Sequence, residues 1–153
     1  MIRTSFVTFE PGDGTFQASM SIDGLLSMDV DHERLLEKAR KAYESNVTKL
    51  RRLMLSIDEQ RQAGTRVPAR DVWKVGDVVF KLTEDLRSLA LEVDDLYAHL
   101  TRDIGVKRKW LEKAIILRRY VPDRKAIPAQ LNWGRIEKGT KRSAERIAQG
   151  LPL

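Results

Sequence analysis

The residues most suggestive of chemistry are cationic side chains that follow a glycine in the stretch 97–116, YAHLTRDIGVKRKWLEKAII. Apolar residues on both sides of Gly105 predict two helices joined by a turn, since a helix that ends at glycine favours the left-handed conformation there. The second helix would direct these charged residues outward: Lys107, Arg108, Lys109, Glu112 and Lys113. The first residues of the second helix in a helix-turn-helix meet base edges in the major groove. The spacing therefore predicts a helix-turn-helix that contacts DNA.

The same spacing also fits an ordinary corner between two amphipathic helices. The inner positions would be Leu100, Thr101, Leu111, Ala114 and Ile115, with Ile104 and Val106 beside the turn. Thr101 stands where a helix-turn-helix usually has a smaller residue, and Lys107 replaces the usual Ser or Thr cap of the second helix. A generic helical corner is therefore the alternative interpretation.

More cations follow this corner, and they make the C-terminal third of the chain basic. Residues 101–149 contain fourteen Lys or Arg and five Asp or Glu, whereas the whole chain of 153 residues has a formal charge of +6. A basic third on a mildly acidic remainder is typical of nucleic-acid binders. The further candidate DNA contacts are Arg118, Arg119, Arg135, Lys138, Lys141, Arg142 and Arg146. The alternative is a charged surface that only keeps the C-terminal helices soluble.

No catalytic, metal or cofactor site is expected. The chain has no cysteine, which excludes disulfides, thiolate nucleophiles and cysteine metal sites, and its two histidines, His32 and His99, are far apart. The sequence has no nucleophile elbow, P-loop or glycine-rich phosphate cradle. It also lacks a signal peptide and any run of about 18 apolar residues. We therefore expect a cytoplasmic protein that is not an enzyme.

The elements that must position the basic residues are mainly helical. Apolar residues recur at steps of three and four in a predicted helix from Asp31 on: Leu36, Ala39, Tyr43, Asn46, Leu50, Leu53 and Ile57. Asn46 would be a polar residue in this stripe, or Val47 would take the buried position instead. A second stripe follows Pro68: Val72, Val75, Val79, Leu82, Leu86, Leu89, Val93, Leu96 and Leu100. It predicts one helix of about 30 residues. Gly76 within it indicates a close helix crossing or a break.

The expected fold class is thus mainly α. A long antiparallel helical hairpin, resembling a coiled coil, leads into the helix-turn-helix, and alternating residues in 16–22 predict a small N-terminal β-hairpin. We divide the chain into a β-hairpin appendage at 1–30, a helical hairpin scaffold at 31–103, and the helix-turn-helix with basic C-terminal helices at 92–149, all in one continuous domain. After Pro122 and Pro128, we expect two short helices near Ala129–Lys138 and Thr140–Gln149, with Thr140 capping the second.

Four short motifs resemble the N-terminal region of the YhcG-type family of predicted restriction-like nucleases. They are Trp73-Lys-Val-Gly76, Leu100-Thr-Arg-Asp103-Ile-Gly105, the segment 111–122 that ends in Tyr-Val-Pro, and Leu131-Asn-Trp133. The resemblance covers about half of the chain, from Trp73 to Ile147, and implies a helical DNA-binding module. It does not extend to a nuclease domain, for which we expect no room after Leu153.

These observations together predict a DNA-binding protein. We expect a dimeric regulator or genome-associated factor that binds double-stranded DNA and pairs through its long helices or its N-terminal hairpin. The main alternative is a helical protein-interaction scaffold or antitoxin-like adaptor. RNA binding by the same basic face is a third interpretation, in which Trp110, Tyr120 and Trp133 offer stacking surfaces.

Overall fold

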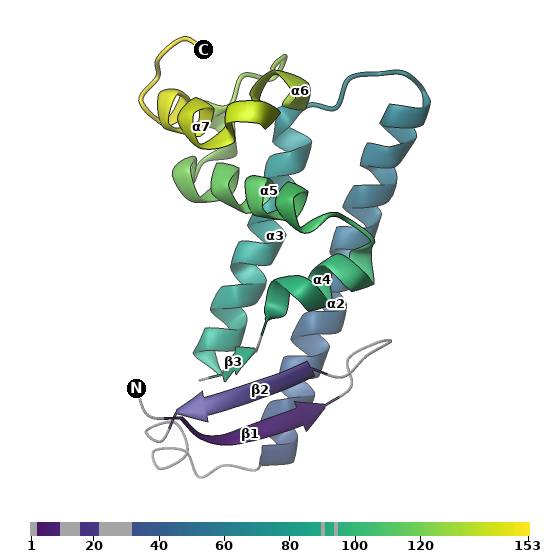
Figure 1. Ribbon diagram of the computed structural model, residues 1–153, viewed down its shortest axis with the longest axis vertical. Helices are drawn as coiled ribbons and strands as arrows, with labels where there is room; N and C mark the ends of the chain where they lie inside the picture. Colours follow the sequence, from purple (N-terminus) through teal and green to yellow (C-terminus); the bar gives the residue numbers. More distant parts are fainter. Residues whose placement is uncertain (1–2, 10–15, 22–31, 90, 94) are drawn as a thin grey trace.

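A computed structural model gives the fold of this chain. It describes residues 3–9, 16–21, 32–89, 91–93 and 95–153, and the side chains of 34–89 and 95–153. The described part is mainly helical, which confirms the expected class. A small sheet lies at one end of two long helices, and the C-terminal helices gather at the other end (Figure 1).

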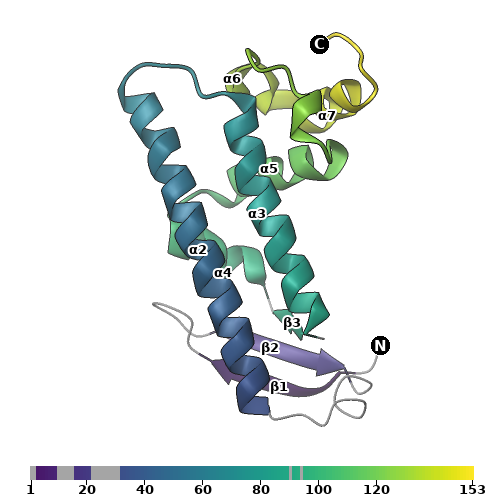
Figure 2. The same cartoon turned by 180° about the vertical axis from the view of Figure 1, so that it is seen from behind.

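The two long helices are α2 (His32–Gln62) and α3 (Ala69–Ser88), which run in opposite directions side by side (Figure 2). The buried face of α2 differs slightly from the predicted stripe, because Leu35 and Met54 take the buried positions and Leu36 and Leu53 are half-buried. Asn46 and Val47 are both buried, so the two expected alternatives coexist. The Asn46 Nδ2 donates to the Ala42 carbonyl at 2.7 Å, which satisfies this buried amide. Asp31, where this helix was expected to begin, lies outside the described residues.

The prediction of one continuous helix from Val72 to Leu100 is wrong. Helix α3 ends at Ser88, a strand β3 (Leu91–Val93) follows, and a new helix α4 (Leu96–Ile104) begins after Asp95. Asp95 has φ 47°, a left-handed conformation that cannot continue a helix. Strand β3 pairs with a strand more than 70 residues earlier in the chain, a contact that leucine spacing cannot reveal. The first helix of the corner is therefore separate from the scaffold helix.

The sheet has three antiparallel strands in the order β1 (Arg3–Phe9), β2 (Phe16–Ser21), β3. Its central strand β2 pairs with both neighbours and joins the N-terminal segment to the connection between α3 and α4. Ile22 and the expected turn between β1 and β2 lie outside the described residues. The sheet closes the end of the scaffold that is remote from the basic helices (Figure 1).

The C-terminal part contains α5 (Arg108–Tyr120), a 3-10 turn η1 (Arg124–Ala126), α6 (Trp133–Ile136), a 3-10 turn η2 (Glu137–Gly139) and α7 (Thr140–Ala148). Helix α6 is shorter than predicted because Asn132 forms a β-bridge with Pro68 and so keeps the chain before Trp133 extended. Thr140 does not cap α7. It is the first residue of that helix, and its hydroxyl donates to the carbonyls of Ile136 and Glu137 at 3.2 and 3.0 Å.

Helices α3 and α5 cross closely at Gly76. A Cβ atom on Gly76 would lie 2.1 Å from the Ala114 carbonyl oxygen and 3.0 Å from the Arg118 Cβ. Only glycine therefore lets the backbones of the two helices approach this far. The Trp73 Nε1 fixes the same crossing by donating to the Val121 carbonyl at 2.7 Å. Of the two expected explanations for Gly76, the close crossing is the correct one.

Replacing Gly76 with alanine should destabilise the fold. The added methyl group must displace the α5 backbone, and such overpacking costs about 1–3 kcal/mol. Urea denaturation of Gly76→Ala against the wild type measures the change in the free energy of unfolding. Gly134→Ala is the matched control, since its Cβ would meet nothing within 4 Å and its φ is not positive. An equally stable Gly76→Ala protein would contradict the close crossing.

Candidate nucleic-acid interface

The corner between α4 and α5 has the turn that the sequence predicts. Gly105 ends α4 at φ 69° and ψ 38°, and its N–H donates to the Thr101 carbonyl at 2.9 Å. The Val106 N–H donates to the same carbonyl at 3.2 Å, and these bonds satisfy one of the last carbonyls of the helix. The predicted inner positions Leu100, Leu111 and Ala114 are fully buried, and Ile115 is 5% exposed. The expected helical phase on both sides of the turn is confirmed.

Helix α4 is held against the scaffold by a polar cluster that sequence reasoning missed. The Tyr43 hydroxyl of α2 donates to the Asp103 carboxylate, whose side chain is 4% exposed. Arg102 also pairs with this carboxylate at 3.1 Å, and the Arg51 Nε donates to the Asp103 carbonyl at 3.0 Å. Burial of the tyrosine, then its bond to Asp103, raises the pKa of Tyr43, so the hydroxyl stays a donor. The cluster fixes the position from which α5 begins.

The N-terminus of α5 carries three exposed cations, Lys107, Arg108 and Lys109. Lys107 is the N-cap and makes no side-chain cap bond, as its residue type predicts. The Arg108 guanidinium donates to Glu112 at 3.2 Å and to Asp95 at 3.1 Å. The bond to Glu112 and the charge of Asp95 raise the pKa of Arg108. Arg108 is therefore neutralised by two carboxylates, one on its own helix and one before α4.

A second group of cations surrounds a hollow of about 510 Å³ between α5 and α7. The lining cations are Lys113 from α5 and Lys138, Lys141 and Arg142 from η2 and α7, and Glu145 is the one acidic residue in this lining. The Lys141 ammonium also lies 5.8 Å from the Tyr120 ring centre. Direct packing of α7 on α5 brings these cations together although they are far apart in sequence.

Arg142 extends this surface into a neighbouring hollow of about 380 Å³. That hollow is lined by Arg135, Arg142, Ser143, Arg146 and Leu153. The Arg146 Nε donates to the Pro152 carbonyl at 2.7 Å, whereas Arg135 and Arg142 have no carboxylate partner among the described residues. We call the lining cations of the two hollows the α5–α7 surface: Lys113, Arg135, Lys138, Lys141, Arg142 and Arg146.

Most cations of the C-terminal helices lack the carboxylate partners that five cations of the scaffold have. On α2 and α3 of the described chain, Arg40, Arg61, Lys74, Lys81 and Arg87 each pair with a carboxylate on the same helix. None of the six cations of the α5–α7 surface forms such a pair, and neither do Lys107, Lys109 and Arg119. Unpaired charges of one sign produce a strong local potential. Unpaired cations thus gather around the two hollows at α5, α6 and α7, and α2 also carries exposed cations outside ion pairs, such as Lys49 and Arg52.

The expectation that Arg118 belongs to the exposed basic face is wrong. Its side chain is 15% exposed, and its Nε donates to Asp77 of α3 at 2.8 Å. The guanidinium carbon lies 4.2 Å from the Phe80 ring centre and 5.5 Å from that of Trp73. Arg118 therefore holds α5 on α3. The sequence spacing could have revealed that Arg118 is buried. Arg118 is seven residues after Leu111 and four after Ala114, so it shares the buried face of the helix with them.

The remaining expectations concern metal sites, membrane-spanning helices and similarity to known proteins. Among the described residues there is no group of three or more His, Asp or Glu side chains that could hold a metal ion. In the same part of the chain, every helix is too short or too polar to cross a membrane. Comparison with protein-family models, curated proteins and solved structures found no match to this chain. The resemblance to the YhcG-type family therefore stays a prediction.

Removal of the Asp77 charge should weaken the α3–α5 contact in a pH-dependent way. Burial tends to raise the pKa of Asp77, but the bonds from Arg118 and Lys81 outweigh it and hold this pKa below its ordinary value. A carboxyl with a lowered folded-state pKa stabilises above its unfolded pKa of about 3.9 and loses this contribution as the pH falls. Asp77→Asn should cost about 1–3 kcal/mol near neutral pH, and less below about pH 4.

Chemical denaturation of Asp77→Asn and the wild type between pH 3 and pH 7 provides the measurement. Glu84→Gln is the control, because its pair with Arg87 is about half exposed and should contribute little. A stability difference for Asp77→Asn that is constant across this pH range would show that the ion pair with Arg118 does not stabilise the crossing.

Proposed function

We propose that this protein binds double-stranded DNA through the α5–α7 surface and the N-terminus of α5. The observation that carries the proposal is the set of unpaired cations that α5, η2, α6 and α7 bring together. Lys and Arg that have no carboxylate partner are free to replace the counterions of DNA phosphates. Because α5 spans the distance between its N-terminal cations and the α5–α7 surface, one duplex can contact both.

The corner between α4 and α5 supports a groove contact. In this proposal Gly105 and the buried inner positions would form the connection of a helix-turn-helix, and Lys107, Arg108 and Lys109 would contact base edges. Arg108 would exchange Glu112 and Asp95 for a base edge or a phosphate on binding. Lys138, Lys141 and Arg142 would contact the phosphate backbone beside the groove.

We further propose that the protein acts as a homodimeric DNA-binding regulator or genome-associated factor without catalytic activity. A dimer could address two half-sites about one helical turn apart. Sedimentation equilibrium at micromolar concentration should give twice the chain mass of 17.6 kDa, and a single-chain mass would contradict the dimer.

Duplex DNA of random sequence should bind strongly at low salt and weakly at high salt. Affinity of a protein with several phosphate contacts falls by on the order of 10³ between about 50 and 200 mM salt. Arg142→Gln should weaken binding on all sequences and lower the salt slope by about one. Arg52→Gln is the control, since Arg52 is an exposed α2 cation without an ion pair. Fluorescence anisotropy of a labelled duplex measures the DNA affinity of the wild type, Arg142→Gln and Arg52→Gln.

The result that contradicts DNA binding is equally clear in this experiment. If the wild type shows no duplex binding at about 50 mM salt, the helical protein-interaction scaffold becomes the better account. Equal weakening by Arg142→Gln and Arg52→Gln would show attraction by net charge alone. Tighter binding of single-stranded RNA than of duplex DNA in the same assay would favour the RNA-binding interpretation.

Replacement of Arg108 tests the groove contact separately from the phosphate contacts. Arg108→Ala removes one cation and leaves Glu112 and Asp95 without their partner, so negative charge faces the DNA. We expect a loss of about 1–3 kcal/mol in binding free energy on a preferred site and a relaxed sequence preference. Competition binding against a randomised DNA library measures both. An unchanged preference would mean that α5 does not read bases.

A further inference from the structure

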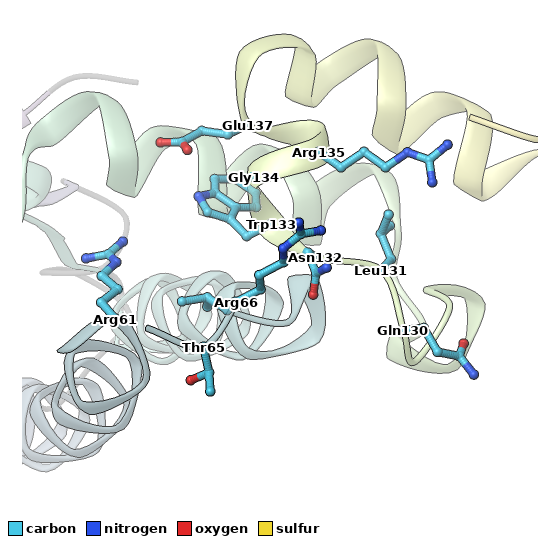
Figure 3. Close-up of a pocket in the computed structure, with 11 residues that line it drawn as sticks. Arg61, Thr65, Arg66, Gln130, Leu131, Asn132, Trp133, Gly134, Arg135 and Glu137 are labelled. Atoms are coloured by element: carbon cyan, nitrogen blue, oxygen red, sulfur yellow. The ribbon is translucent and has the colours of Figure 1, made fainter. Parts of the chain in front are cut away.

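A third hollow, of about 570 Å³, lies between the C-terminal end of α2, the link at 63–68 and the segment that leads into α6 (Figure 3). None of its cations except Arg135 belongs to the surface described above. The lining residues are Arg61, Thr65, Arg66, Val67, Gln130, Leu131, Asn132, Trp133, Gly134, Arg135 and Glu137. Three arginines from three separate segments thus meet at one opening that contains a single acidic residue.

The floor of this hollow is built from fixed backbone. The Trp133 N–H donates to the Val67 carbonyl at 2.8 Å, and the Ala69 N–H donates to the Leu131 carbonyl at 2.9 Å. The Trp133 side chain is 3% exposed and packs edge-to-face on Trp110, with ring centres 6.3 Å apart. A ligand therefore meets a site whose backbone needs little further ordering, which reduces the entropic cost of binding.

The arginines of this hollow are largely free to bind a ligand. Arg66 and Arg135 form no ion pair with any described residue. Arg61 pairs with Asp58 at 3.4 Å, a weak pair because both side chains are about half exposed, and its guanidinium carbon lies 5.9 Å from the Trp110 ring centre. Figure 3 shows Arg66 beside Asn132 and Trp133, with Arg61 across the opening, while the guanidinium of Arg135 points away from Trp133. Arg135 thereby joins this hollow to the α5–α7 surface, which it also lines.

We propose that this hollow binds a phosphate group through Arg61 and Arg66, with Arg135 at its rim. Guanidinium groups donate pairs of hydrogen bonds that match phosphate oxygens, and they remain charged at every physiological pH. The side-chain amide of Asn132 lies beside Arg66 and adds a neutral donor to the same opening (Figure 3). The phosphate could belong to DNA bound on the adjoining surface or to a free nucleotide. The site goes beyond the proposed function, since it needs no DNA.

Calorimetric titration of the full chain with inorganic pyrophosphate and with deoxyadenosine monophosphate tests whether the phosphate group comes from a free ligand. Wild type should give saturable binding, and Arg66→Gln should weaken it about tenfold, as expected for the loss of a hydrogen bond from a charged group. Arg66 is exposed on the link, so thermal unfolding of the variant should match the wild type. Arg52→Gln again provides a matched control and should bind like the wild type.

A titration of the same proteins with duplex DNA tests whether the phosphate group comes from bound DNA. If pyrophosphate does not bind, but Arg66→Gln lowers duplex affinity and the salt slope by about one while Arg52→Gln does not, the DNA supplies the phosphate. If neither titration responds to Arg66→Gln, or both variants respond equally, the proposed site is overturned. Pyrophosphate binding that depends on Arg66, together with no DNA binding, would refute the proposed function and leave this site intact.

Discussion

The close approach of α3 and α5 at Gly76 is the constraint on which the basic end of the molecule depends. A Cβ on Gly76 would lie 2.1 Å from the Ala114 carbonyl oxygen, so the crossing exists only with glycine. Arg118 and Asp77 complete it with a mostly buried ion pair, and Trp73 adds a hydrogen bond to Val121. Because α7 packs on α5, the positions of Lys113, Lys141, Arg142 and Arg146 follow from this contact.

The charges of this protein are used in two different ways. On the long helices, Arg40, Lys81 and Arg87 each pair with an acidic residue one turn away, whereas exposed α2 cations such as Lys49 and Arg52 do not. On the C-terminal helices, acidic residues are few, and the cations from different elements lie side by side without them. The exceptions on α5 are Arg118, which pairs with Asp77, and Arg108, which is held by Glu112 and Asp95. A DNA phosphate or base edge would have to displace these two carboxylates from Arg108. Binding at Arg108 therefore depends on how strongly the DNA group competes with them.

Helical periodicity predicted most of the fold because α2, α3 and α5 each bury one stripe of side chains. It failed between Leu89 and Asp95, where pairing of β3 with β2 and the left-handed backbone of Asp95 end the helix. Leucine spacing cannot show this, since the decisive partner is remote in sequence. The composition showed that the C-terminal third is basic, but it could not separate Arg118, which faces α3, from its exposed neighbours. It also gave no sign of Arg61 and Arg66, which tertiary packing brings to the hollow beside α6.

The location of bound DNA can be measured directly by amide chemical-shift changes of the labelled protein during titration with a short duplex. The structure predicts that the largest changes fall at Lys107–Lys113 and at Arg135–Arg146, the two stretches that carry the exposed cations of α5, α6, η2 and α7. Residues on the exposed face of α2, such as Lys49 and Arg52, should change little. Changes concentrated on α2, or no changes at a low salt concentration, would contradict DNA binding by the basic end of this protein.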